Sequence, residues 1–151
     1  MTHEDYVSFE TAKLLKEKGF DGSCHRYYRC DKEDIDGNGK MFMFASDLNG
    51  FCCVTNSLLN NYGDEHEETV LAPTFQMAMK WLREKGFHIF VPNEIDYDED
   101  ERGNRWYHQP AYYPEIRRVS DGKIMYDDGS LYATPEQACE VAIKYCLENL
   151  I

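Results

Sequence analysis

The sequence has no long apolar run. Hydrophobic residues make up 42% of the 151 positions but occur in short stretches, whereas a membrane-spanning helix needs about 20 consecutive apolar residues. Residues 1–5 are polar and charged, so we expect no secretory leader. The sequence therefore predicts a cytoplasmic protein with no membrane-spanning helix.

The motifs of common catalytic sites are also missing. No Gly-x-Ser-x-Gly surrounds a nucleophilic serine, and there is no glycine-rich phosphate-binding loop. His66-Glu67-Glu68 lacks the second histidine of a metallohydrolase motif. These absences favour a non-catalytic protein. Because a site assembled from distant residues leaves no motif, a small enzyme stays an alternative.

No two cysteines have the Cys-x-x-Cys spacing of zinc and redox sites. Adjacent cysteines and five-residue gaps suit zinc poorly. We expect reduced thiols, most of them buried as small apolar side chains. The six cysteines are Cys24, Cys30, Cys52, Cys53, Cys139 and Cys146.

Basic residues are scarce relative to acidic ones. Sixteen Lys and Arg face 28 Asp and Glu, for a formal charge of −12. This balance disfavours binding to nucleic acids or anionic membranes, because phosphates are repelled. It raises the alternative of an acidic DNA-mimicking anti-restriction or anti-repressor protein, although the acids cluster in segments that we expect to be loops.

A near-repeat is the clearest pattern that is present. Residues 14–20 (LLKEKGF) return as residues 81–87 (WLREKGF). Each copy is typical of the last turns of a helix that ends at a glycine. The chain has the length of one domain, so we expect a single α+β domain over residues 1–151, with possible duplicated halves at 1–70 and 71–151.

Capping residues and hydrophobic periodicity predict three helices, at 8–18, 74–85 and 135–150, with Ser8, Thr74 and Thr134 as N-caps. Strands are predicted at 25–30, 40–44, 51–55, 88–91, 115–119 and 123–126, with Asp121-Gly122 as a tight turn. Residues 56–68 are predicted to be a loop. The fold class is therefore α+β, with antiparallel sheets covered by three helices in the order α-β-β-β-α-β-β-β-α.

One loop has the beginning of a calcium-binding pattern. Asp34, Asp36 and Asn38 occupy positions 1, 3 and 5 of an EF-hand-like loop, followed by Gly39. Position 12 is Ala45 rather than the bidentate glutamate, and a strand pattern follows. We favour a hairpin loop and no cofactor, and keep calcium as the alternative.

An aromatic segment with proline at its edges is the best candidate for a contact surface. It contains Trp106, Tyr107, Tyr112 and Tyr113. Aromatic side chains concentrate in the energetically important parts of protein interfaces. Packing against the body of the protein is the alternative.

Residues 6–21, the segment from Ala72 to Glu84 and the closing helix resemble a group of small proteins from gut anaerobic bacteria, their phages and other mobile elements. The group has no assigned activity, so the resemblance implies a setting and no site residue. We therefore expect a non-catalytic protein-interaction module of phage or mobile-element origin. A protein partner is expected and a homodimer is possible; the alternatives are a DNA mimic and a small calcium-binding or enzymatic domain.

Overall fold

The computed structural model describes residues 5–31, 39–43, 54–59 and 67–151. Three long helices and one single-turn helix are present in these ranges. They are α1 (Phe9–Glu17), α2 (Asn56–Leu59), α3 (Phe75–Glu84) and α4 (Pro135–Asn149). None of the helices in these ranges is long and apolar enough to cross a membrane.

Side-chain caps set where the long helices begin. The side chains of Ser8, Thr74 and Thr134 each accept the backbone N–H of the residue three positions later. At the other end, Gly19 and Gly86 follow α1 and α3 with φ of 86° and 102°, a left-handed conformation that glycine adopts without steric cost. The predicted helix starts and both glycine corners are confirmed.

The first sheet has the order β2-β1-β3 and is antiparallel. Its strands are β1 (Arg26–Asp31), β2 (Lys40–Met43) and β3 (Glu67–Leu71). The predicted loop at 56–68 is wrong at both ends, because residues 56–59 form α2 and Glu67 begins β3. Of the strand predicted at 51–55, residues 51–53 lie outside the described residues, and Val54 forms an isolated bridge with Cys24.

The second sheet has the order β10-β9-β4 and is also antiparallel. Its strands are β4 (Phe87–Phe90), β9 (Glu115–Arg118) and β10 (Ile124–Tyr126). The predicted β9–β10 hairpin is confirmed, with Gly122 at φ 71° in the turn. Arg118 Nε donates to Asp121 Oδ1 at 3.0 Å, and this guanidinium contact holds the pKa of Asp121 at about 2.

The two halves correspond in the helix and its glycine corner, and differ in the strands that follow. The first strand after α1, β1, is the central strand of its sheet. The first strand after α3, β4, is at an edge. The repeat in the sequence therefore marks a shared helix-to-strand corner, after which the strands are ordered differently.

Helix α4 lies against α1, α3, β4 and β9, so it joins the two halves. Apolar side chains from the three long helices and both sheets form one buried core. Its largest fully buried members include Leu15, Leu71, Leu82, Ile116, Ile143 and Leu147. We call this part of the molecule the body.

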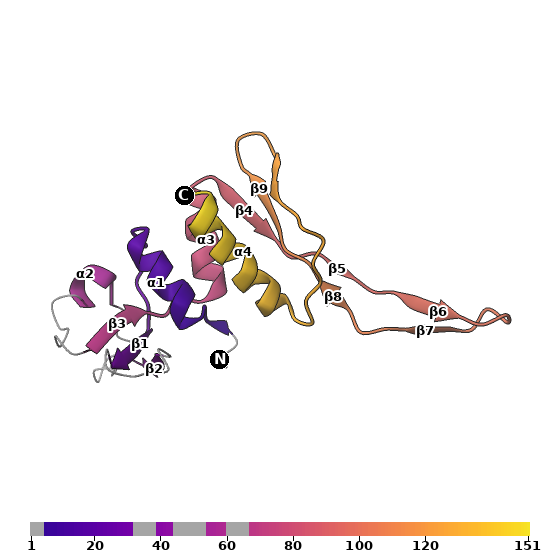
Figure 1. Cartoon of the computed structure of the whole chain (residues 1–151), viewed down its shortest axis with the longest axis horizontal. Coiled ribbons are helices and arrows are strands. Elements are labelled where there is room, and N and C mark those ends of the chain that lie inside the picture. Colours follow the sequence, from indigo (N-terminus) through magenta and orange to yellow (C-terminus); the bar gives the residue numbers. More distant parts are fainter. Residues whose placement is uncertain (1–4, 32–38, 44–53, 60–66) are drawn as a thin grey trace.

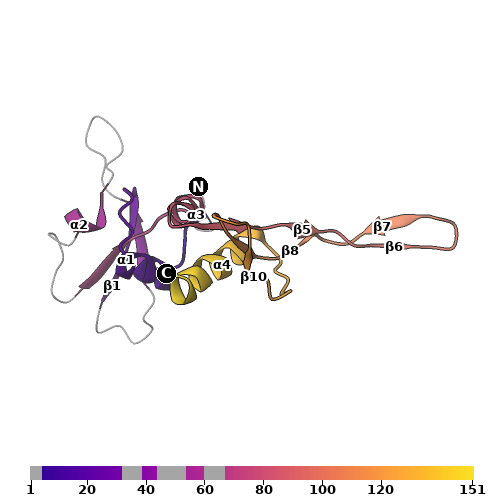
Figure 2. The ribbon, with the colours of Figure 1, turned by 90° about the horizontal axis from the view of Figure 1, so that it is seen from above.

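A two-stranded ribbon leaves the body between β4 and β9. It contains β5 (Asn93–Glu94) paired with β8 (Ala111–Tyr112), and β6 (Tyr97–Glu99) paired with β7 (Arg105–Tyr107). Figures 1 and 2 both show it extending far beyond the helices. We call residues 91–113 the arm.

Candidate functional site

The arm is exposed over nearly its whole length. Residues 93–99 and 101–109 are all exposed, and Asp100 is half-buried. A two-stranded hairpin is at best marginally stable in water without a core. Contacts within the arm must therefore hold its two strands together.

The tip of the arm is closed by hydrogen bonds to one carboxylate. Asp100 Oδ1 accepts the backbone N–H groups of Arg102 and Asn104, each at 2.9 Å, and Oδ2 accepts Asn104 Nδ2 at 2.9 Å. These bonds, the Asn104 side chain above all, lower the pKa of Asp100. Gly103 supplies the positive φ, 83°, that reverses the chain.

One face of the arm carries two tyrosines and an ion pair. Tyr97 pairs with Tyr107 across the strands, and their ring centres are 5.6 Å apart. The next pair on this face is Glu99 with Arg105, joined by a 2.7 Å contact between Oε2 and Nε. The Arg105 guanidinium also lies 4.6 Å from the centre of the Tyr97 ring. Cross-strand pairs of these kinds stabilise a two-stranded sheet.

The other face carries Trp106. Its cross-strand partner is Asp98, whose Oδ2 is 2.9 Å from His108 Nε2. Trp106 is 52% exposed and makes no aromatic contact with the part of the chain that the structure describes. Its indole is therefore available to a partner.

The four predicted contact residues are divided between two places. Trp106 and Tyr107 lie on the arm, where Tyr107 is 66% exposed. Tyr112 and Tyr113 lie half-buried at its base. There Tyr112 exchanges backbone hydrogen bonds of 2.8 and 2.7 Å with Tyr132, and the Tyr113 N–H donates to the Pro92 carbonyl at 3.2 Å. The base thus joins the arm to the body.

Sequence reasoning missed the apolar residues on the first strand of the arm. Ile95 and Tyr97 are 52% and 46% exposed, and neither was among the four predicted contact residues. Gly103 between two segments that each contain an aromatic was the available signal for a hairpin.

The arm is acidic. Between residues 91 and 113 there are six carboxylates and two guanidinium groups. The acids are Glu94, Asp96, Asp98, Glu99, Asp100 and Glu101, and the bases are Arg102 and Arg105. Exposed aromatic rings are therefore surrounded by mostly negative charge.

The second candidate site is a concave region on the body, which we call the α4 groove and which has a volume of about 710 Å³. Side chains from the N-terminal segment, β1, α3 and the start of α4 line it. They are Tyr6, Ser8, Tyr28, Phe75, Tyr132, Thr134, Glu136, Gln137, Glu140 and Val141.

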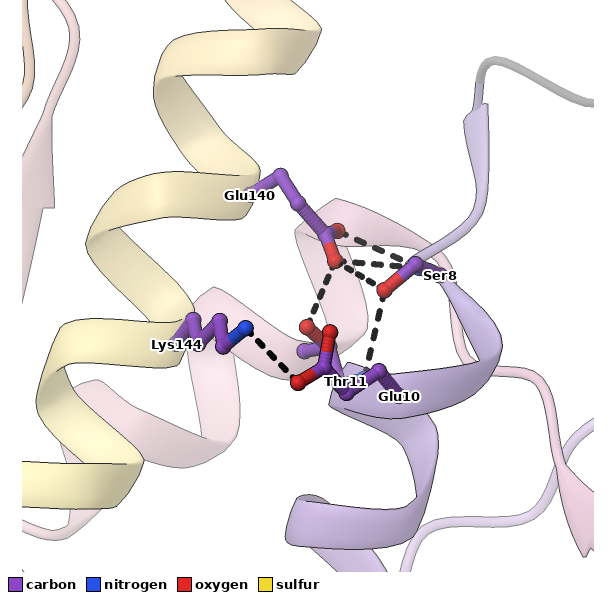
Figure 3. Close-up of polar contacts among 5 residues, drawn as sticks. All are labelled: Ser8, Glu10, Thr11, Glu140 and Lys144. Carbon is purple, nitrogen blue, oxygen red and sulfur yellow. Dashed lines mark hydrogen bonds and ion pairs between the residues drawn. The ribbon is translucent and has the colours of Figure 1, made fainter. Parts of the chain in front are cut away.

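At one side of the groove, Glu140 of α4 holds the first turn of α1. Figure 3 shows its carboxylate directed at Ser8 and Thr11. Glu140 accepts the Ser8 N–H at 3.2 Å, the Ser8 hydroxyl, and the Thr11 hydroxyl at 2.5 Å. Lys144, one turn further on, pairs with Glu10 at 2.8 Å. Ser8 has the contacts of a helix cap joined to a second helix rather than those of a nucleophile beside a base.

Burial raises the pKa of three groups in the body. The Tyr28 hydroxyl donates to the Val7 carbonyl at 2.5 Å, and burial together with the charge of Glu140 raises its pKa to about 12. Burial raises the pKa of the Cys139 and Cys146 thiols to about 11 and about 12. These thiols are therefore protonated and unreactive at neutral pH.

The calcium hypothesis stays a prediction, because Asp34, Asp36 and Asn38 lie outside the described residues. Cys52 and Cys53 also lie outside them. Cys24, Cys30, Cys139 and Cys146 are buried. Within the described ranges, no three or more His, Cys, Asp or Glu side chains are grouped to hold a metal ion.

Comparisons of the chain with protein-family models, with curated proteins and with solved structures found no match. The arm and the α4 groove are therefore the features from which a function can be inferred.

Proposed function

We propose that the protein is a non-catalytic interaction module that binds a partner protein through its arm. One observation carries the proposal: the arm holds Tyr97, Trp106 and Tyr107 about half exposed or more, far from the core. Partner binding would bury these rings.

The arm has the composition of an interface. Trp, Tyr and Arg dominate binding energy at protein interfaces, and charged groups at the rim exclude wrong partners. Here the rings of Tyr97 and Trp106 are bordered by Glu99, Arg105 and Asp98. The rings provide apolar surface that a partner can bury, and the charges fix the orientation in which the partner binds.

Charge selects the kind of partner. Six acids against two arginines favour a basic protein surface that can accept aromatic rings. The same charge disfavours a second copy of this chain, because two acidic arms repel each other. The interaction should weaken as salt is added.

An acidic DNA mimic has less support. Such a protein needs a continuous line of negative charge. Along the arm, aromatic rings interrupt the acids, and Arg105 pairs with Glu99. The arm therefore suits a mixed apolar and acidic contact better than imitation of a phosphate backbone.

Capture from cells that express the protein tests the proposal by comparing two double variants. Trp106→Ala with Tyr107→Ala removes two of the three exposed aromatic rings of the arm. Val119→Ala with Ile124→Ala is the matched control, because these side chains are 55% and 47% exposed on another hairpin. We expect quantitative mass spectrometry to find partners of the wild type that are lost only with the arm variant.

A lost partner should also dissociate from the wild type as salt rises. Recovery of the same proteins by all three forms would overturn the proposal. If a partner is lost with the arm variant but does not dissociate as salt rises, the arm is still the binding site, but the partner surface is not basic.

A further inference from the structure

The α4 groove combines aromatic walls with carboxylates. Four aromatic side chains line it, Tyr6, Tyr28, Phe75 and Tyr132. They come from four separate segments of the chain, so the fold itself assembles them. Aromatic faces attract cations because their π-electrons are negative.

The two glutamates of the groove differ in what they contact. Glu136 and Glu140 are four residues apart on α4, on one side of the helix. Glu140 is occupied by Ser8 and Thr11. Glu136 is half-buried, and its carboxylate makes no hydrogen bond or ion pair with any other described residue. Its charge is thus available to a bound cation.

Among the described residues that line the groove, none carries a positive charge. A neighbouring hollow of about 290 Å³ shares Phe75 and Glu136, and its lining residues in the described ranges also include no Lys, Arg or His. The Arg26 guanidinium lies 4.9 Å from the centre of the Tyr6 ring, so that ring already contacts a cation. Tyr28 is buried, and its ring packs edge-on against Phe9. Phe75 and Tyr132 are therefore the rings left for a ligand.

We propose that the α4 groove binds a small organic ammonium ion, with Glu136 pairing with the ammonium group and the apolar body lying against Phe75 and Tyr132. An ammonium at this position also relieves the like-charge repulsion between Glu136 and Glu140. The site goes beyond the proposed function, because no residue of the arm takes part. An anionic ligand is disfavoured by the two carboxylates.

The test uses benzylamine, which is positively charged at neutral pH, and benzyl alcohol, its uncharged counterpart of similar shape. Titration of the ¹⁵N-labelled protein, followed by amide chemical shifts, gives both affinity and location. We expect benzylamine to shift the amides of Gln137 and Val141 with a Kd of about 1 mM. Benzyl alcohol should bind about tenfold more weakly.

Variants distinguish the contribution of the Glu136 charge to ligand affinity from that of the aromatic walls. Glu136→Gln should weaken benzylamine about tenfold and leave benzyl alcohol unchanged, whereas Glu148→Gln, on an exposed residue of the same helix, should change neither. Tyr132→Leu should weaken both ligands. Thermal unfolding checks that each variant is folded.

Three results would overturn the site: no shifts from benzylamine at these amides, equal affinity for the alcohol, or an unchanged affinity in Glu136→Gln. None of them bears on the arm, because Trp106 and Tyr107 are intact in every form titrated.

Discussion

The body and the arm of this protein are stabilised in opposite ways. In the body, Ile143 and Leu147 of α4 have no exposed surface. On the arm, Trp106 and Tyr107 are more than half exposed. Burial of apolar surface is the dominant favourable term in folding, so the body accounts for most of the free energy of unfolding. The arm is held by hydrogen bonds and side-chain pairs between its strands.

This difference separates stability from binding. A change at a buried residue of the body alters the free energy of unfolding, whereas changes at exposed residues of the arm should alter it little. The arm can therefore carry a specific surface at little cost to the fold. Substitutions in the two regions should differ in size accordingly.

The largest expected effect is from a cavity in the body. Ile143→Ala removes a fully buried side chain at the centre of α4. We expect the free energy of unfolding to fall by about 2–5 kcal/mol, measured by urea denaturation. Ile124→Ala, on an exposed residue, is the control and should stay within about 0.5 kcal/mol. A similar cost for both would show that α4 is not at the centre of the core.

The next largest effect is expected at the contact between α4 and α1. Glu140→Ala removes the acceptor of the Ser8 N–H and of the buried Thr11 hydroxyl. Hydrogen bonds to a charged group contribute about 1.5–3 kcal/mol, so we expect a loss in that range.

Thr11→Val provides the control for that loss. In the wild-type background, Thr11→Val should lower the free energy of unfolding. In the Glu140→Ala background it should lower it much less, because the Thr11 hydroxyl has already lost its acceptor there. Equal costs in both backgrounds would contradict the coupling.

The ends of the elements were predictable from local residues. Ser8, Thr74 and Thr134 cap their helices, and Gly122 forms its turn, because these effects depend on neighbours within four positions. Strand β3 was not predictable. Glu67 and Glu68 are typical of a loop, but in the sheet they lie 3.6 Å from the charged nitrogens of Arg29 and Lys13. Those partners are more than 30 positions away in the sequence.

In the candidate sites too, features set by nearby residues were predictable and features set by distant residues were not. Trp106 and Tyr107 were recognised by composition, but their exposure depends on the ribbon's distance from the body. The contact of Glu140 with Thr11 joins residues 129 positions apart, and no local pattern marks it. The α4 groove could not be predicted because each of its walls comes from a different segment.

A smaller effect, which depends on pH, is expected at Tyr28. Its folded pKa of about 12 lies above the ordinary value of 10.0, so folding favours the neutral phenol. The resulting stability is fully present below pH 10 and is lost as pH rises from 10 to 12. Tyr28→Phe should cost about 1 kcal/mol at neutral pH, through loss of the bond to Val7.

The same variant should lose less stability than the wild type between pH 10 and 12. Urea denaturation across this range measures both slopes. Cys146, whose thiol pKa is raised to about 12, is present in both forms, so its contribution cancels in the comparison. If the free energy of unfolding falls with pH equally steeply in both forms, the loss of stability above pH 10 comes from groups other than Tyr28.

The smallest effect on the free energy of unfolding is expected from the largest change in the chain, the removal of most of the arm. Glu94 and Ala111 pair directly across β5 and β8, so residues 95–110 can be replaced by Asn-Gly, which closes two paired strands in a tight turn. The replacement keeps the contact of Tyr112 with Tyr132. Because the removed residues are almost all exposed, we expect the free energy of unfolding to change by less than about 1 kcal/mol. Urea denaturation measures it beside Ile143→Ala, and a loss as large as that variant's would show that the arm is part of the folding unit.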